Sequence, residues 1–244
     1  MAHKTYINKV SGARKAVLFI HGFLGSPEHF ERFIMHVPND ISVYNILLEG
    51  HGGSVLDFGK ASMQEWKKQV TEVTDELCAN YEQIYIVAHS MGTFFAMEEA
   101  IKLSDKVIGL YLLQTPLKIA VKPTAAINTL RSFFDVFSNN AVAKAYKDAH
   151  SVKLNFRLWE YLFWIPRYLE LFKESKKART TILELDTQCL IFQSRRDELV
   201  SMKSLCFIPQ KSNIQVKVLN NSAHFIYDCE EEKLLIDCFI NMIS

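Results

Sequence analysis

The chain has 244 residues, of which 49% are hydrophobic and 23% charged, a balance typical of a globular protein with a substantial core. The formal net charge of +1 excludes a global field that would select nucleic acid or another polyanion. A short basic group is interpreted as a solvated helix face and not as a nucleic-acid surface; it comprises Lys173, Lys176, Lys177 and Arg179.

Four strands are predicted in the first half of the chain. Each is a short apolar run bounded by turn-forming or charged residues, which is the signature of a buried strand. They span residues 16–20, 41–48, 84–88 and 107–113.

Amphipathic segments separate these runs. Ser26 followed by Pro27 predicts a helix start, after which Phe30, Phe33 and Ile34 recur at helical spacing. The clearest helix spans residues 62–81, and another is predicted over 91–103. In the first of these, Ser62 is the expected N-cap, Glu65 completes a capping box, and one apolar stripe contains Trp66, Val70, Val73 and Leu77.

The same pattern resumes near the C-terminus, with strands predicted over 188–193 and 214–219 and a helix over 230–243. Strands that are apolar on both faces and separated by helices predict a mostly parallel sheet covered on both sides. Residues 117–185 lack this rhythm, so we expect a core formed by residues 1–116 and 186–244 and an insertion over 117–185.

Five irregularly spaced cysteines without a CxxC pair predict neither a disulfide framework nor a zinc site. The polar first residues do not resemble a signal peptide, and the longest apolar runs are too short to span a bilayer. We therefore expect a protein of the reducing cytoplasm without stable membrane insertion.

The strongest chemical signal is Ala88-His89-Ser90-Met91-Gly92, at the junction of a predicted strand and a predicted helix. A serine in such a tight turn holds its hydroxyl clear of the backbone, and small residues two before and two after it allow strand and helix to approach closely. The unpaired amides at the start of the helix also favour negative charge beside the serine.

This segment resembles the nucleophile elbow of the α/β-hydrolase family, and the resemblance covers nearly the whole chain. The departure is Ala88, where the usual Gly-x-Ser-x-Gly pattern has glycine. The resemblance implies the α/β-hydrolase fold, with residues 117–185 as a helical cap, and an activity like that of carboxylesterases and monoacylglycerol lipases.

An activated serine needs a base, and the base needs an orienting carboxylate. The family order of nucleophile, acid and histidine, with the last two on loops after the final strands, implies Asp197 and His224. The rivals for the acid are Glu198, one position further along the same loop, and Asp186, which precedes its strand and so falls at the wrong end of the sheet.

Residues His21-Gly22-Phe23-Leu24-Gly25 follow the first strong strand and resemble the family's His-Gly-x motif. The resemblance implies that the backbone amides of Phe23 and Met91 form the oxyanion hole. The glycine-rich stretch 49–54, with His51, is interpreted as structural.

The insertion carries many aromatic side chains, and some of them are expected to line an acyl pocket, with Trp159, Phe163 and Trp164 the candidates. The others in this group are Phe133, Phe134, Phe137, Tyr146, Phe156, Tyr161, Tyr168 and Phe172.

These features together predict a serine hydrolase that cleaves small-molecule carboxylic esters with a hydrophobic acyl group, through an acyl-enzyme on Ser90, without a metal or organic cofactor. Two alternatives stay open. One is thioester hydrolysis or acyl transfer on the same three residues, and the other is a hydrolase-like protein that binds a ligand without catalysis.

Overall fold

One sheet forms the centre of the computed structural model, which describes residues 3–122 and 150–244. Within that part of the chain the strand order is β1-β3-β2-β4-β5-β6-β7. All neighbours are parallel except β1 and β3, which are antiparallel. The strands are β1 (Tyr6–Asn8), β2 (Lys15–Ile20), β3 (Ile41–Ile46), β4 (Gln83–His89), β5 (Val107–Leu113), β6 (Gln188–Ser194) and β7 (Ile214–Leu219). The predicted α/β fold with a mostly parallel sheet is confirmed.

Strand β1 is the one strand in the described residues that the sequence pattern does not predict. It has three residues, all exposed, and it pairs along the outer edge of β3. An edge strand of this length carries no apolar run or alternation, because neither face is buried.

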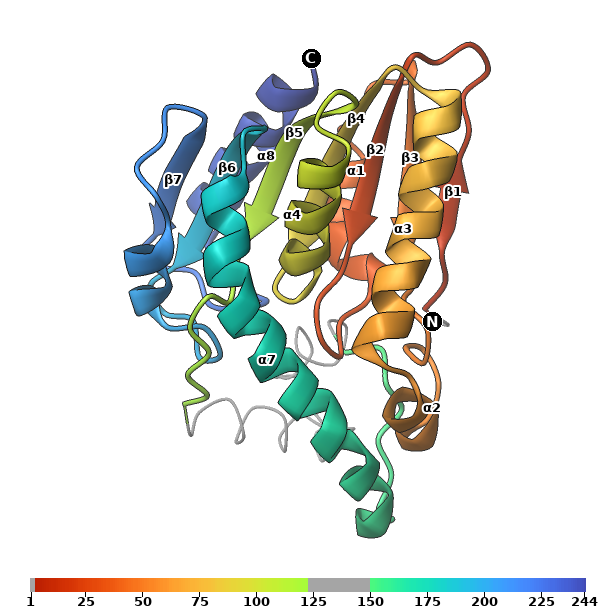
Figure 1. Ribbon diagram of the computed structural model, residues 1–244, viewed down its shortest axis with the longest axis vertical. Helices are drawn as coiled ribbons and strands as arrows, with labels where there is room; N and C mark the ends of the chain where they lie inside the picture. Colours follow the sequence, from red (N-terminus) through yellow and green to blue (C-terminus); the bar gives the residue numbers. More distant parts are fainter. Residues whose placement is uncertain (1–2, 123–149) are drawn as a thin grey trace.

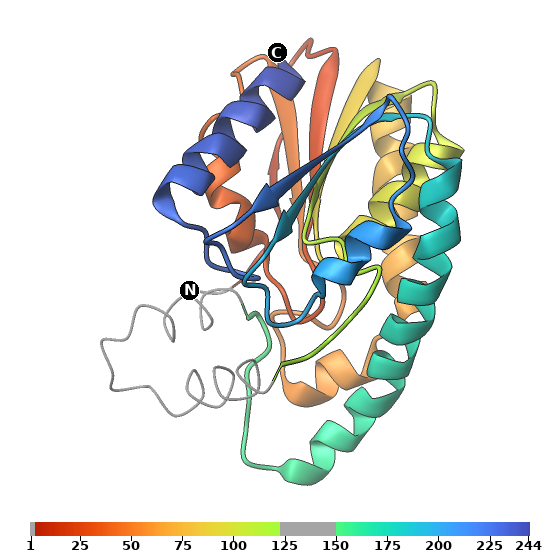
Figure 2. The ribbon, with the colours of Figure 1, turned by 90° about the vertical axis from the view of Figure 1, so that its left-hand side faces the viewer.

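Helices cover both faces of the sheet (Figures 1 and 2). On one face lie α3 (Met63–Asn80), α4 (Gly92–Lys102) and α7 (Ile165–Thr181), and on the other α1 (Glu31–Ile34) and α8 (Cys229–Ile243). Strand β2 shows why its run is apolar throughout: Leu18 packs into the first layer, while Val17 and Phe19 pack into the second. A strand covered on both faces is therefore apolar at most of its positions.

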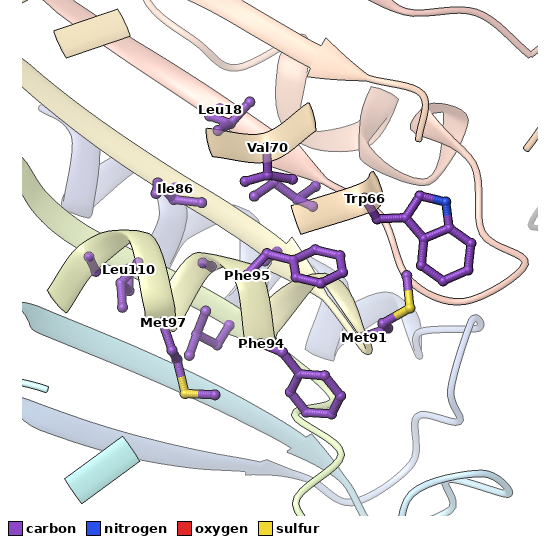
Figure 3. Packing of buried hydrophobic residues seen from close by; sticks show 14 of the residues in the cluster. Leu18, Trp66, Val70, Ile86, Met91, Phe94, Phe95, Met97 and Leu110 are labelled. Atoms are coloured by element: carbon purple, nitrogen blue, oxygen red, sulfur yellow. The ribbon is translucent and has the colours of Figure 1, made fainter. Parts of the chain in front are cut away.

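Helix α3 begins at the predicted N-cap, since the Ser62 hydroxyl accepts a hydrogen bond from the Glu65 amide at 3.2 Å. The predicted capping box is not formed, because the Glu65 carboxylate accepts from the Ser62 hydroxyl, at 2.9 Å, and not from the Ser62 amide. Trp66 and Val70 are fully buried in the layer between α3, α4 and the sheet (Figure 3). Leu77 is also fully buried, but the fourth buried position on the stripe is Thr74, with Val73 only partly buried. The predicted start at Ser26–Pro27 is a 3-10 turn, η1 (Pro27–Phe30), capped by the Ser26 side chain and followed directly by α1.

The sequence pattern does not predict α2 (Val55–Lys60), which follows the glycine-rich stretch. Its N-terminus has a complete capping box, in which Ser54 accepts from the Asp57 amide and the Asp57 carboxylate accepts from the Ser54 amide. The carboxyl ends of the parallel strands point towards α2 and the first half of α7, at the bottom of Figure 1. The remaining short helices are η2 (Leu158–Trp164), η3 (Ile182–Glu184) and η4 (Met202–Phe207).

Helix α7 belongs to the segment predicted as a cap, and it contacts both the core and the region beyond the sheet. It packs on the sheet layer through Leu171, just before its middle, and Ala178, in its second half, which are buried in the same cluster as the strands. Its first half extends past the ends of the strands (Figures 1 and 2). The division into core and cap therefore stays a prediction. No helix in the described ranges is long and apolar enough to cross a bilayer.

Candidate active site

Ser90 lies in a sharp turn between β4 and α4, as predicted. Its φ of +51° is in the left-handed region, which non-glycine residues rarely adopt and which places it on a strained turn. A Cβ on Gly92 would lie 2.7 Å from the carbonyl oxygen of His21, so only glycine allows α4 to start this close to the end of β2. His89 and Met91 are buried, whereas Ser90 is partly exposed. The turn thus presents one reactive side chain to the outside.

Asp197 and His224 are brought together across two loops at the same edge of the sheet. Asp197 follows β6, His224 follows β7, and His224 Nδ1 lies 2.8 Å from Asp197 Oδ2. Both residues are about 99% buried, so this polar pair is shielded from water. The other carboxylate oxygen, Oδ1, accepts hydrogen bonds from the amides of Leu199 and Val200, each at 2.8 Å.

These bonds determine which nitrogen of His224 carries the proton. A carboxylate can only accept, so Nδ1 donates to Asp197 and the neutral ring has its lone pair on Nε2. A histidine in this tautomer is a general base at Nε2.

The His224 ring lies next to the elbow, with its centre 4.7 Å from that of His89, the residue before Ser90. Within the described residues no hydrogen bond joins the Ser90 hydroxyl to His224 Nε2. Contacts of this kind are often long in the absence of substrate, so the pairing of Ser90 with His224 stays a prediction.

The loop before His224 is held by Glu231 in the first turn of α8. This carboxylate accepts hydrogen bonds from the amides of Asn220, Asn221 and Ser222 at 2.6 to 3.2 Å. The Ser222 hydroxyl also donates to it at 2.5 Å. One acidic side chain therefore orders three consecutive residues of the histidine loop.

The His21–Gly25 loop passes directly over the elbow. A Cβ on Gly22 would lie 2.7 Å from Ser90 Cβ and 3.3 Å from Ser90 Oγ. In the part of the chain that the structure describes, the Phe23 and Met91 amides donate to no other protein group, which leaves them free for a ligand oxygen. Phe23 directly follows Gly22 in this loop and Met91 directly follows Ser90, and the oxyanion hole formed by their two amides stays a prediction.

His21 has a structural role that the motif alone does not reveal. Its Nδ1 donates to the Gly22 carbonyl at 2.9 Å, and its Nε2 accepts from the Leu48 amide at 3.0 Å. Burial lowers the pKa of His21 to about 4, so the ring is neutral and can make both bonds at once. His51 packs against it with ring centres 4.6 Å apart.

The rivals for the acid lie where their positions in the sequence suggest. The Asp186 side chain is 88% exposed, precedes β6 and forms an ion pair with Lys211 at 3.2 Å. Glu198 is buried near the site, but it contacts the backbone amide of His224 at 3.3 Å and not the ring. Of these three acidic residues, only Asp197 is hydrogen-bonded to the His224 imidazole.

The three predicted pocket aromatics have different surroundings. Trp159 and Phe163 are 65% and 53% exposed, whereas Trp164 is buried against Phe58 of α2 and donates to the Val55 carbonyl at 2.8 Å. Four other aromatics of the insertion (Phe133, Phe134, Phe137 and Tyr146) lie outside the described residues.

One aromatic residue of the insertion that was not among the three pocket candidates contacts the His21–Gly25 loop. The ring of Tyr168, on α7, lies 5.0 Å from that of Phe23. Phe23 also packs edge-on against Phe58 and Trp66, at 5.0 and 6.2 Å. These four aromatic side chains form an apolar wall beside the His21–Gly25 loop, here called the oxyanion loop after its predicted role. Helical spacing alone cannot show which residue of α7 contributes to this wall.

Comparison with known proteins agrees with the observed fold. The profile of the alpha/beta hydrolase family matches residues 17–232, and the chain belongs to that family. The resemblance drawn from the elbow is thereby confirmed. No curated protein matches the sequence significantly.

Several solved structures share the fold at low sequence identity. A structure of the metagenome-derived lipolytic enzymes LipS and LipT is 18% identical with a TM-score of 0.72, covering 99% of this chain and 97% of that one. Monoacylglycerol lipase from Paleococcus ferrophilus is 16% identical with a TM-score of 0.65, covering 98% and 99%. A thioesterase domain from the curacin biosynthetic pathway is 14% identical with a TM-score of 0.63, covering 98% and 100%.

Proposed function

We propose that this protein is a serine hydrolase that cleaves small-molecule carboxylic esters with a hydrophobic acyl group. The observation that carries the proposal is the buried 2.8 Å contact between Asp197 and His224 Nδ1, next to a serine at φ +51° on the elbow. This contact leaves Nε2 of His224 as the basic nitrogen on the side of the ring away from Asp197. The lipases and esterases among the structural neighbours support the choice of ester chemistry.

In the proposed reaction, Ser90 attacks the ester carbonyl as its hydroxyl proton passes to His224 Nε2. Asp197 holds the ring in the required tautomer and stabilises the imidazolium. The Phe23 and Met91 amides donate to the developing oxyanion, a contribution of several kcal/mol at comparable sites. His224 then protonates the leaving alcohol, and water repeats the sequence on the acyl-enzyme.

The apolar preference rests on the wall beside the oxyanion loop. Phe23 is in ring contact with Phe58, Trp66 and Tyr168, and Phe58 also contacts Trp66. Phe58 and Trp66 are fully buried and support Phe23 from behind, whereas Phe23 and Tyr168 are partly exposed. An aliphatic or aromatic acyl group bound against Phe23 and Tyr168 would be removed from water, which favours longer apolar esters over acetate. Trp159 and Phe163 remain candidates for the same role further out on the cap.

The first experiment is labelling with a fluorophosphonate followed by mass spectrometry. We expect one rapid adduct on Ser90, absent in Ser90→Ala and in His224→Gln and retained in the control His36→Gln. Folded wild-type protein that takes up no adduct would refute the enzymatic proposal and favour a ligand-binding protein. The cytoplasmic location stays a prediction that labelling does not address.

A panel of p-nitrophenyl esters of rising chain length, run beside acyl-CoA thioesters, separates the two enzymatic possibilities. We expect kcat/KM to rise with chain length on the esters and to exceed that on the thioesters. The reverse order would favour a thioesterase, the activity named for one of the structural neighbours.

A further inference from the structure

The main chain of His224 is held from both sides by buried side chains. Its amide donates to Glu198 Oε2 at 3.3 Å, and its carbonyl accepts from His89 Nε2 at 3.0 Å. His89 directly precedes Ser90, and Glu198 directly follows Asp197. The sequence neighbours of Ser90 and Asp197 are thus hydrogen-bonded to the backbone of His224, the third residue of the proposed triad.

These two bonds replace those that regular structure would supply. His224 lies in the loop between β7 and α8, so no ladder or helix satisfies its amide and carbonyl. The nearest backbone bond in the loop runs from the Ala223 amide to the Ile226 carbonyl, at 2.8 Å. A buried peptide group left without a partner costs free energy comparable to a lost hydrogen bond, so both contacts oppose displacement of the loop.

The His89 ring is itself fixed in place. A carbonyl oxygen can only accept, so Nε2 of His89 carries the proton. The ring lies between those of His29, at 4.3 Å, and His224, at 4.7 Å. His29 in turn pairs with the Tyr227 hydroxyl at 3.3 Å. The donor to His224 is therefore part of a packed row of rings and not a loose surface group.

The burial of Glu198 is unfavourable in free energy, and its hydrogen bond to His224 accounts for its position. The side chain is 95% buried, and its second oxygen, Oε1, has no hydrogen-bond partner in the described residues. Burying a carboxyl with one oxygen unsatisfied is unfavourable. The bond to the His224 amide is the polar contact that this carboxyl makes in return.

We propose that His89 and Glu198 are positioning residues that set where the His224 imidazole lies relative to Ser90. The inference rests on the proposed function, in which His224 is the base. The Asp197 contact defines the tautomer and tilt of the ring, while the two backbone contacts define the position of its Cα. A misplacement of about 1 Å can lower a rate by about 100-fold.

The test uses two variants that remove a bond and two that keep it. His89→Phe keeps the ring and loses the donor, whereas His89→Gln can still present an amide N–H near the Nε2 position. Glu198→Met loses the acceptor, whereas Glu198→Gln keeps an oxygen. His29→Phe is the matched control in the same row of rings, and Glu99→Met is the control for a buried glutamate elsewhere.

The first readout is the second-order rate of fluorophosphonate labelling at Ser90. We expect His89→Phe and Glu198→Met to label about 10-fold or more slowly, with the glutamine variants and both controls within about 3-fold of wild type. With an ester substrate, kcat should fall while KM changes little. Glu198→Met tests the claim from the opposite side of the peptide should His89→Phe fail to fold.

Hydrogen exchange over residues 222–226 is the second readout and needs no activity. Faster exchange confined to this loop in His89→Phe and Glu198→Met, but absent in His29→Phe, supports the proposal. Wild-type labelling rates together with unchanged exchange would overturn it while leaving the proposed function intact. If wild-type protein fails to label, the proposed function fails, and unchanged exchange would then overturn the positioning role as well.

Discussion

Mild acid should destabilise this protein through four buried histidines. His21, His29, His51 and His89 are each at least 94% buried. Burial lowers the pKa of His21 to about 4 and holds the pKa values of the other three well below the ordinary 6.5. In the unfolded chain all four regain ordinary values, so folding becomes linked to proton release.

The sign and size follow from these values. Between pH 6.5 and pH 4 the unfolded chain binds protons that the folded protein refuses, so the free energy of unfolding falls as the pH falls through this window. At pH 5 the lowered pKa of His21 costs about 2 kcal/mol relative to pH 8. His29, His51 and His89 add to this loss in the same direction. Typical domains have a total stability of about 5–15 kcal/mol, so the loss is a substantial part of it. Above pH 7 the stability contributed by the neutral rings is fully present.

His51→Leu isolates one of these sites. In the described residues His51 Nε2 has no hydrogen-bond partner, and the Glu49 carbonyl that faces Nδ1 also accepts from the Trp66 indole at 2.7 Å. Leucine is close in size to histidine and leaves little unpaired. We expect the loss of stability between pH 8 and pH 5, measured by urea unfolding at each pH, to be smaller in the variant, because the proton that His51 binds in the unfolded chain is no longer taken up.

Two results would refute this reasoning. One is equal wild-type stability at pH 8 and pH 5. The other is a His51→Leu variant with the same pH dependence as wild type, which would show that carboxyl groups and not buried histidines cause the loss.

Three further predictions concern the site and its scaffold. Asp197→Asn should lower kcat by about 10⁴-fold with little change in KM, because the wrong tautomer of the base is favoured, while Asp186→Asn should match wild type in the same ester assay. Gly22→Ala should slow fluorophosphonate labelling by about 100-fold, since its Cβ would lie 2.7 Å from that of the nucleophile; wild-type labelling would contradict the placement of the loop. The Lys67 side chain, 24% exposed, joins α3 to α4 and α7 through ion pairs with Glu98 and Glu174, so Lys67→Met should lower the free energy of unfolding by about 1–2 kcal/mol. The control Lys68→Met, at an exposed ion pair, should change it by less than about 0.5 kcal/mol. Equal losses in the two variants would refute a stabilising role for the Lys67 ion pairs.

The sequence by itself determined six of the seven strands in the described residues, the helices predicted over 62–81, 91–103 and 230–243, and the order of the chemical groups. Strand β7 matches its predicted bounds, β4 is one residue longer at each end, and β6 is one residue longer at its C-terminal end. This works because a strand covered on both faces is mostly apolar, as β4 is, whereas the partly exposed β7 shows alternation instead. Ser90, Asp197 and His224 could be chosen because the resemblance to the α/β-hydrolase family implies the order of nucleophile, acid and histidine. Each of the three also lies in the loop after a predicted strand, and parallel strands end at one edge.

Only the tertiary structure decided which side chains meet. The hydrogen bond from His89 to the His224 carbonyl joins residues 135 positions apart. It depends on the conformations of two loops, and each loop is shaped by the side chains that pack against it. The aromatic residues of the insertion show the same dependence on distant contacts. Trp164 of η2 is buried against Phe58 of α2, while Tyr168 of α7 contacts Phe23 in the His21–Gly25 loop. Helical spacing tells which residues share a face but not what that face is packed against, because the partner comes from a distant part of the chain.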